Sequence, residues 1–203
     1  MSTYLEFEKP IEVLDNKIFE LKSLNDRAPS ESLLEEITNV EQEINDTYKK
    51  IYSSISPWQR TLVARHTDRP KTQHYIEGLI ENFFPLSGDR AFSEDKAIIG
   101  GFGKFRGKTV LVIGHEKGHD TTSRIEHNFG MPRPEGYRKA QRLMKLAEDF
   151  DIPVISFVDT PGAYPGVGAE QRGQSEAIAK TTECCLSLGV PIVVVIIGCL
   201  LYT

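Results

Sequence analysis

The N-terminal part of the chain repeats hydrophobic residues at the spacing of two amphipathic helices. They recur every three or four positions and so share one face of each helix: Ile11, Leu14, Ile18 and Leu21, then Leu33, Ile37, Val40, Ile44, Tyr48 and Ile51. Asn25 to Pro29 interrupts this pattern, and Ser32 with Glu35 has the spacing of a capping box. We predict a helical hairpin over residues 1–56, ended by Pro57, as an arm for packing or for a partner.

The remaining residues, 57–203, combine short hydrophobic runs with helical periodicity. Residues 58–95 have a mixed pattern that predicts a loop-rich segment. Strands are predicted over 97–101, 109–114, 153–158 and 190–197, with a turn at 104–108. Helices are predicted after Pro134, with Tyr137, Ala140, Met144 and Ala147 on one face, and over 170–188. Strands that are apolar at nearly every position and alternate with helices predict a mainly parallel sheet covered on both faces.

The amino-acid composition indicates a globular protein and argues against two kinds of partner. The 203 residues are 39% hydrophobic and 26% charged, which is typical of a soluble globular protein with one domain and a small appendage. The net charge of −5 argues against a nucleic-acid partner held by phosphate contacts, and it does not favour binding to an anionic membrane.

The cysteines and the termini indicate a cytoplasmic protein. Cys184, Cys185 and Cys199 do not form a disulfide framework, so a reducing compartment is the simplest interpretation. The first ten residues show no secretory signal. The apolar stretch from Val190 to Tyr202 is too short and too rich in β-branched residues to span a membrane, so it predicts a buried strand.

Three motif-like matches are weak. His115 to His119 has the letters of the zinc motif HExxH, but Gly114 and Gly118 disfavour the helix that this motif needs. We expect a strand-to-loop turn with exposed polar residues there, and no bound metal. Gly101 to Gly103 is half of a dinucleotide fingerprint, and its third glycine and its helix are missing.

A nucleotide triphosphate site is the third weak match. Asp159 to Gly162 fits the DxxG element of GTPases, and Gly107, Lys108 and Thr109 resemble the end of a phosphate-binding loop. A GTPase-like switch therefore remains an alternative function. However, the GKT sequence opens a predicted strand, whereas a phosphate-binding loop opens a helix.

The stronger chemical signal is the segment from Ile152 to Glu170. A buried strand is followed by a loop rich in glycine and proline, and a helix begins near Ala169. Glycines let the backbone approach a ligand closely, and prolines restrict the backbone of the loop. Backbone N–H groups at a helix start are suited to stabilising a developing oxyanion. We therefore interpret this loop as functional.

This segment and others resemble the alpha subunit of the bacterial acetyl-CoA carboxylase carboxyltransferase. The matching motifs are ARH at 64–66, GDRA at 88–91, DKAI at 95–98, IGH at 113–115, NFGMPRPEGYRKA at 128–140, DTPGAYPGVGAE at 159–170 and RGQSEAIA at 172–179. The resemblance extends from about residue 4 to Gly198 and includes the N-terminal hairpin. It implies an α/β, crotonase-like fold of repeated ββα units over residues 57–203, after the hairpin of residues 1–56.

The resemblance also implies a reaction and partners. Carboxybiotin on the biotin carboxyl carrier protein gives its carboxyl group to acetyl-CoA, and malonyl-CoA forms for fatty-acid synthesis. The beta subunit is expected to supply the acetyl-CoA side and a zinc ribbon, and biotin carboxylase to belong to the same α2β2-containing complex. No cofactor is expected on this chain itself, because biotin enters as carboxybiotin on the carrier protein. No metal is expected either, and the zinc ribbon is not in this chain, because its three cysteines form no CxxC pair.

The resemblance places the site in the glycine-rich loop. It implies that the backbone N–H groups of Gly166 and Val167 act as oxyanion donors. The residues implied to contact carboxybiotin are Asp159, Thr160, Pro161, Gly162, Tyr164, Pro165 and Gly168. We expect Gly166 to need a positive φ and close backbone approach.

The chain departs from the family pattern after Gly198. Alpha subunits continue from this strand into a glycine-rich turn, which supplies the second oxyanion donor, and a large C-terminal portion. Here Cys199 to Thr203 contains no glycine. The sequence thus resembles a truncated or frame-disrupted alpha subunit. We expect it not to form malonyl-CoA in this form, and a fragment that only binds partners is the alternative function.

Overall fold

The computed structural model describes residues 3–200, and the chain divides into two compact units, Met1–Asp68 and Arg69–Thr203. Residues 201–203, at the end of the stretch predicted as a buried strand, lie outside the described residues, as do residues 1–2. Each unit is described by itself.

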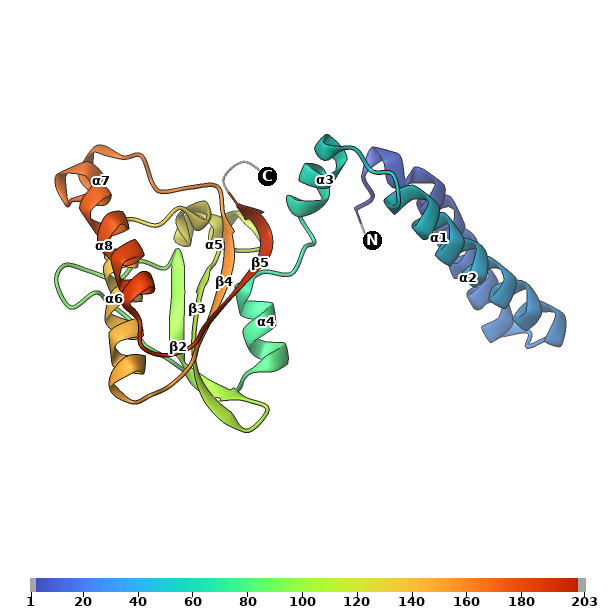
Figure 1. Cartoon of the computed structure of the whole chain (residues 1–203). Coiled ribbons are helices and arrows are strands. Elements are labelled where there is room, and N and C mark those ends of the chain that lie inside the picture. Colours follow the sequence, from blue (N-terminus) through green and yellow to red (C-terminus); the bar gives the residue numbers. More distant parts are fainter. Residues whose placement is uncertain (1–2, 201–203) are drawn as a thin grey trace. The chain divides into compact units, whose positions relative to one another are not determined.

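The first unit is built on the predicted helical hairpin. A short 3-10 helix, η1 (Glu6–Glu8), leads into α1 (Lys9–Arg27), which lies beside α2 (Glu31–Tyr52) (Figure 1). The periodic residues Leu21, Ile37, Val40 and Ile44 form its core. Lys17 pairs with Glu36 at 3.2 Å and Lys22 with Glu41 at 2.8 Å across the two helices. The hydrophobic stripes of the two helices thus pack against each other.

Two predictions about the helix ends in this unit are wrong. The N-cap of α2 is Ser30, so Ser32 and Glu35 lie inside the helix and form no capping box. Pro57 begins α3 (Pro57–Ala64) and follows a true capping box, in which the Gln59 amide donates to Ser56 Oγ at 3.2 Å and the Ser56 amide to Gln59 Oε1 at 2.7 Å. Proline fits here because the first helical residue needs no N–H partner.

The second unit contains a five-stranded mixed sheet in the order β1-β2-β3-β4-β5. Its strands are β1 (Glu81–Pro85), β2 (Ile98–Phe105), β3 (Lys108–His115), β4 (Val154–Thr160) and β5 (Ile192–Leu200). β1, β2 and β3 pair antiparallel, whereas β3, β4 and β5 pair parallel. The prediction of a mainly parallel sheet is therefore correct only for the half that contains β4 and β5.

Helices cover both faces of this sheet (Figure 1). On one face, α6 (Pro134–Asp149) and α8 (Gln174–Ser187) pack on a core that includes Leu111, Leu143 and Val154. On the other face, α4 (Thr72–Leu79) packs through Ile76 against Val112 and Phe157. Ala140, Met144 and Ala147 of α6 are buried together, as predicted from their spacing.

The loop-rich interpretation of residues 58–95 is wrong, because α3, α4 and β1 lie there. The turn between β2 and β3 is tighter than predicted, since only Arg106 and Gly107 connect the strands. Both have positive φ, 50° and 77°, as a two-residue hairpin turn requires. The helix predicted over 170–188 is divided by Gly173, at φ 80°, into α7 (Val167–Gln171) and α8.

β5 differs from the predicted buried strand. It lies at one edge of the sheet, and the side chains from Val193 to Ile196 remain 39–57% exposed. Ile197 to Cys199 do enter the interior, whereas Leu200 at the end of the strand is exposed again. Within residues 3–200, none of the helices has the length and apolar character needed to cross a bilayer.

Candidate active site

The carboxyl ends of β3, β4 and β5 meet at one edge of the second unit, because these strands are parallel. Ligands of open α/β sheets bind outside such strand ends. The loop predicted as functional leaves β4 here and leads into α7. Short elements from earlier in the chain, α5 (Thr121–Glu126) and the 3-10 helix η2 (Asn128–Gly130), complete this region.

Asp159 joins the three strand ends. Its side chain is buried, pairs with the ammonium group of Lys117, which follows β3, and accepts a hydrogen bond at 2.9 Å from the Cys199 amide of β5. A Cβ on Gly198 would lie 2.4 Å from Asp159 Oδ1, so this strand approaches the carboxylate closely only as glycine. The partners of this carboxylate are thus groups of the protein itself, and they connect the ends of the three strands.

Thr160 anchors the start of the loop. Its hydroxyl donates to the Gly130 carbonyl at 2.7 Å and accepts from the Gly162 amide at 3.0 Å. Gly162 has φ 137°, a conformation that L side chains rarely adopt. The chain therefore bends at Pro161, directly after the end of β4.

The middle of the loop is held by Tyr164. Its amide donates to the Pro132 carbonyl at 3.0 Å, and the Arg133 guanidinium lies 4.9 Å from the centre of its ring. A Cβ on Gly166 would lie 2.2 Å from Tyr164 Cε1. Gly166 has φ −88°, so the expected positive φ is wrong, and close packing under the tyrosine ring explains the glycine instead.

Val167 and Gly168 occupy the first two positions of α7, after the N-cap Gly166. The first amides of a helix have no acceptor within the helix, so they are available to an anionic group. All the residues that the sequence analysis assigned to the site therefore lie on one stretch of chain, from the end of β4 to the start of α7. They are Asp159, Thr160, Pro161, Gly162, Tyr164, Pro165, Gly166, Val167 and Gly168.

Gln174 supports this connection from α8. Its side-chain amide donates to the carbonyls of Pro132 at 3.0 Å and Tyr164 at 3.3 Å. Its Oε1 atom is buried and has no partner among the described residues. Pattern analysis alone gave no role to this glutamine, although it lies in the RGQSEAIA motif.

The HExxH segment is not the exposed turn that we expected. Glu116 is buried and accepts hydrogen bonds from the amides of Gly118 at 2.8 Å and Gln73 at 2.9 Å. Burial lowers the pKa of His115 to about 4. His119 is exposed, and residues 3–200 contain no group of three metal-ligating side chains. The segment therefore forms hydrogen bonds at the strand ends, and it does not form the helix of a zinc motif.

Backbone strain next to Thr160 was not visible in the sequence. Asn128, Phe129 and Gly130 have φ 48°, 56° and 72° in succession. Left-handed conformations of non-glycine residues are costly and cluster at functional sites. Phe129 is also half exposed beside this strained turn, so the NFG motif presents an aromatic side chain to the solvent.

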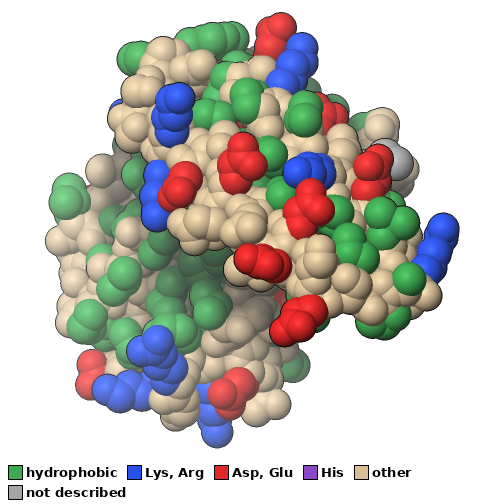
Figure 2. Space-filling view, turned by 90° about the vertical axis from the view of Figure 1, so that its right-hand side faces the viewer, with side chains coloured by type: hydrophobic (Ala, Val, Ile, Leu, Met, Phe, Trp, Pro, Cys, Tyr) green, Lys and Arg blue, Asp and Glu red, His purple; other side chains and the backbone are tan. Residues whose placement is uncertain are grey.

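The other motif-like matches take part in strands. Gly101 to Gly103 lies inside β2, and Lys108 begins β3 after the hairpin turn. The GKT sequence therefore opens no helix, which removes the main requirement of a phosphate-binding loop. The face in Figure 2 shows acidic and basic side chains interspersed, rather than a continuous basic tract.

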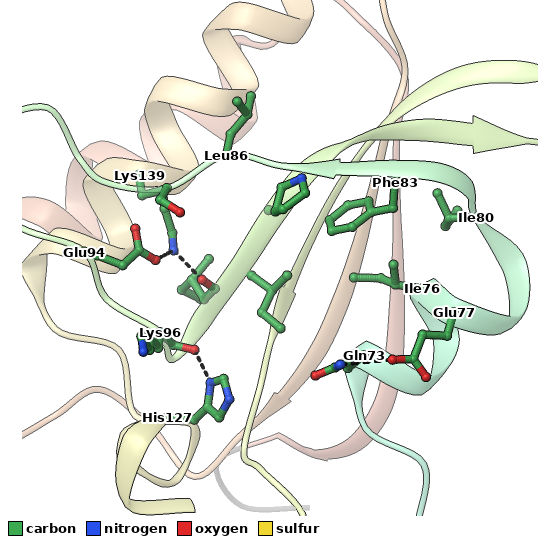
Figure 3. Close-up of a pocket in the computed structure, with 15 residues that line it drawn as sticks. Gln73, Ile76, Glu77, Ile80, Phe83, Leu86, Glu94, Lys96, His127 and Lys139 are labelled. Atoms are coloured by element: carbon green, nitrogen blue, oxygen red, sulfur yellow. Dashed lines mark hydrogen bonds and ion pairs between the residues drawn. The ribbon is translucent and has the colours of Figure 1, made fainter. Parts of the chain in front are cut away.

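A separate cavity of about 520 Å³ lies between α4, β1 and β2. Its lining is mainly apolar and includes Ile76, Ile80 and Phe83, while Lys139 and Glu94 point toward each other at one end (Figure 3). None of residues 159–168 lines it. The cavity is therefore distinct from the β4–α7 connection.

Comparison with known proteins shows which family and which relatives this chain resembles in sequence. The family described as acetyl co-enzyme A carboxylase carboxyltransferase-like matches residues 4–199. The acetyl-coenzyme A carboxylase carboxyl transferase subunit alpha of Rhodopseudomonas palustris (strain HaA2) is 57% identical over 198 residues, which are 98% of this chain and 61% of that protein. The corresponding subunit of Mesorhizobium japonicum is 56% identical over 98% of this chain and 63% of its own length. The chain thus spans less than two thirds of these relatives.

Solved structures share the fold. The transcarboxylase 12S structure with hydrolysed methylmalonyl-coenzyme A aligns with a TM-score of 0.53 and 20% identity over 64% of this chain and 23% of that chain. A single-chain, multi-domain long-chain acyl-CoA carboxylase aligns with a TM-score of 0.53 and 24% identity over 66% of this chain and 13% of that chain. These neighbours confirm the predicted crotonase-like α/β fold.

The family match and the sequence identity lead to the same conclusion. The matched region includes both the hairpin and the connection from β4 to α7. More than half of the aligned residues are identical to those of alpha subunits in several bacteria. The chain belongs to the acetyl-coenzyme A carboxylase carboxyltransferase family.

Proposed function

We propose that this chain supplies the carboxybiotin side of an acetyl-CoA carboxylase carboxyltransferase. The observation that carries the proposal is the connection from β4 to α7. Thr160 and Tyr164 hold its backbone in place, and the first amides of α7 have no acceptor within the helix. Family membership supports the same assignment. The reaction is the transfer of a carboxyl group to acetyl-CoA, which gives malonyl-CoA.

Backbone groups suffice for this chemistry. Carboxybiotin, when bound, supplies the carboxyl group. The α-carbon of the acceptor thioester would give up its proton to the ureido group that loss of the carboxyl group leaves behind, and it would form the new bond to the carboxyl carbon, while negative charge develops transiently on the thioester oxygen. Preorganised N–H donors stabilise such oxygens, and one donor contributes about 3 kcal/mol to lowering a barrier of this kind. In our proposal the amides of Gly166 and Val167 act in this way toward the biotin-bearing substrate.

The other residues of the connection have two kinds of role in this proposal. Asp159 and Thr160 position the loop, because their side chains bind Lys117, Cys199 and the neighbouring backbone. The remaining residues form the wall against which carboxybiotin lies, namely Pro161, Gly162, Tyr164, Pro165 and Gly168. The chain binds no cofactor of its own in this scheme.

The proposal includes partners in the cytoplasm. A beta subunit with a zinc ribbon supplies the acetyl-CoA side, the biotin carboxyl carrier protein delivers the substrate, and biotin carboxylase loads it. The hairpin is suited to docking in an α2β2 assembly, because Val13, Phe19 and Leu34 are exposed on its surface.

Biotin-dependent binding of the carrier protein tests the proposal. The full chain should bind biotinylated carrier more tightly than unbiotinylated carrier, and Gly166→Val should remove that difference. Equal affinity for the two forms of the carrier would overturn the proposed function. Formation of labelled malonyl-CoA with the beta subunit then distinguishes a catalytic chain from one that only binds partners.

A further inference from the structure

Phe129 combines an unfavourable backbone conformation with an exposed aromatic side chain. Its φ of 56° lies in the left-handed region, which costs free energy for a bulky residue. Its neighbours Asn128 and Gly130 are buried, whereas Phe129 itself is 49% exposed. The strained backbone therefore holds an aromatic ring that the protein covers only in part.

The residue after Phe129 is bound to the start of the connection from β4 to α7. The Gly130 carbonyl accepts a hydrogen bond from the Thr160 hydroxyl at 2.7 Å. A Cβ on Gly130 would lie 3.4 Å from the Asp159 carbonyl oxygen and 2.5 Å from Lys117 Cγ, so this backbone lies directly against the end of β4. Consecutive Cα atoms are about 3.8 Å apart, which places Phe129 beside the connection.

The residue before Phe129 is linked to the middle of the same connection. Asn128 Oδ1 accepts a hydrogen bond from Arg133 Nη2 at 3.4 Å. The guanidinium of Arg133 in turn lies 4.9 Å from the centre of the Tyr164 ring. Phe129 is thus held between two links to the connection, one at its start and one at Tyr164.

A single exposed hydrophobic residue needs no explanation by itself. Phe150 at the end of α6 is such a residue, because it is 68% exposed and its φ is an ordinary −108°. Phe129 differs from it, since its backbone is strained and both of its neighbours are linked to the candidate site. Strained residues that the surrounding structure holds in place cluster at sites that contact ligands.

We infer that Phe129 contacts the bicyclic ring of biotin when the carboxylated group enters the site. This inference rests on the proposed function, which places carboxybiotin against residues 159–168. The fused rings of biotin are compact and largely apolar, with the ureido group at one edge. They therefore need an apolar surface in addition to N–H donors for the ureido oxygen. In the proposed site Gly166 and Val167 provide the donors, and Phe129 provides the apolar surface.

Binding of the carrier protein to the full chain measures this contact. Isothermal titration calorimetry gives the dissociation constants of biotinylated and unbiotinylated carrier, and their ratio is the preference for biotin. Phe129→Ala should lower this preference about fivefold to tenfold, as expected for the loss of an apolar contact, and leave binding of unbiotinylated carrier unchanged. Phe150→Ala is the matched control and should keep the preference, because Phe150 precedes the opposite end of β4.

Phe129→Gly separates binding from folding. It removes the ring as alanine does, but glycine adopts a positive φ without strain. Phe129→Gly should therefore unfold at a higher denaturant concentration than Phe129→Ala and lose the preference for biotin to the same extent. If Phe129→Gly kept the preference that Phe129→Ala loses, the residue would act through the fold, and the inference would be wrong.

The outcomes also separate this inference from the proposed function. If the unmodified chain prefers biotinylated carrier and Phe129→Ala keeps that preference, the proposed function stands and this inference is wrong. If Phe129→Ala weakens binding of both forms of the carrier equally, the ring contacts the carrier protein rather than biotin, and the inference is again wrong. Equal affinity of the unmodified chain for the two forms would overturn both.

Discussion

Two buried lysines of the second unit differ in how their charges are satisfied. Lys139 of α6 is 1% exposed, and its ammonium donates to Glu94 and to the carbonyls of Asp95 and Ile98. These three acceptors match its three donors. Lys71 is 8% exposed as a residue, but its ammonium reaches the solvent and makes no hydrogen bond or ion pair in the described part of the chain. Burial lowers the pKa of both groups, and Glu94 opposes this effect at Lys139.

The difference separates a lysine that links elements of the fold from one that does not. Lys139 connects α6 to the segment before β2 and makes its contacts inside the fold (Figure 3). Lys71 precedes α4, and its ammonium donates to no protein group among residues 3–200. The charge of Lys139 is satisfied by protein acceptors, whereas the ammonium of Lys71 reaches the solvent and is hydrated there.

The largest expected effect is on stability at Lys139. Lys139→Met should lower the free energy of unfolding by about 4 kcal/mol, because it leaves Glu94 and two carbonyls without their donor. Lys71→Met should change it by less than about 1 kcal/mol, since the Lys71 ammonium reaches the solvent and makes no hydrogen bond or ion pair in the described part of the chain. Denaturant unfolding of both variants measures the contrast. Equal destabilisation would show that the two lysines do not differ as described.

A second effect concerns pH at the Lys71 side of the unit. Burial lowers the pKa of His115 from 6.5 to about 4, so the unfolded chain takes up a proton at a higher pH than the folded chain. The free energy of unfolding should therefore fall as pH decreases from about 6.5 to about 4, by at most about 3 kcal/mol from this group. His115→Gln should flatten the curve in this window. An unchanged slope in that variant would contradict burial of a neutral imidazole.

A third effect sharpens the role of the loop. Gly166→Val should lower stability by about 1–2 kcal/mol, because its Cβ meets the Tyr164 ring at 2.2 Å in the present packing. Biotin-dependent carrier binding should be lost as well. Denaturant unfolding and carrier binding measure the two changes. Retention of biotin-dependent binding would show that the loop does not contact the biotin-bearing substrate.

The smallest effect serves as a control in α4, the helix that follows Lys71. A Cβ on Gly78 would meet nothing within 4 Å, and alanine is favoured over glycine in helices. Gly78→Ala should therefore raise the free energy of unfolding by about 0.5 kcal/mol without changing biotin-dependent carrier binding. A change in that binding would indicate that the site depends on the stability of α4.

Much of this fold could be predicted from the sequence, because local patterns determine it. The stripes of α1 and α2, the face of α6 and the apolar runs of β3, β4 and β5 all follow from periodicity. The glycine- and proline-rich segment after β4 was located for the same reason, since turn residues act locally. α4 and β1 were missed, because each is short and mixes polar with hydrophobic residues.

The rest depends on tertiary contacts that no local pattern contains. Glu116 is buried because amides from α4 and from its own loop bind it. The left-handed turn at Asn128 to Gly130 has no local signal at Phe129, a residue type that rarely adopts positive φ. The burial of Lys71 was not predicted either, since a lysine before a helix is ordinarily exposed. The packing of Gly166 under Tyr164 likewise appears only in three dimensions.

The most direct test is to observe the Phe129 ring itself while the carrier protein binds, by fluorine NMR of the full chain with 4-fluorophenylalanine at its phenylalanine positions. Phe129→Leu identifies its resonance, and Phe150 provides an exposed reference in the same sample. The account predicts that biotinylated carrier shifts the Phe129 resonance and unbiotinylated carrier does not, while the Phe150 resonance stays constant in both. A Phe129 resonance that does not respond, or that responds equally to the two forms of the carrier, would contradict the account.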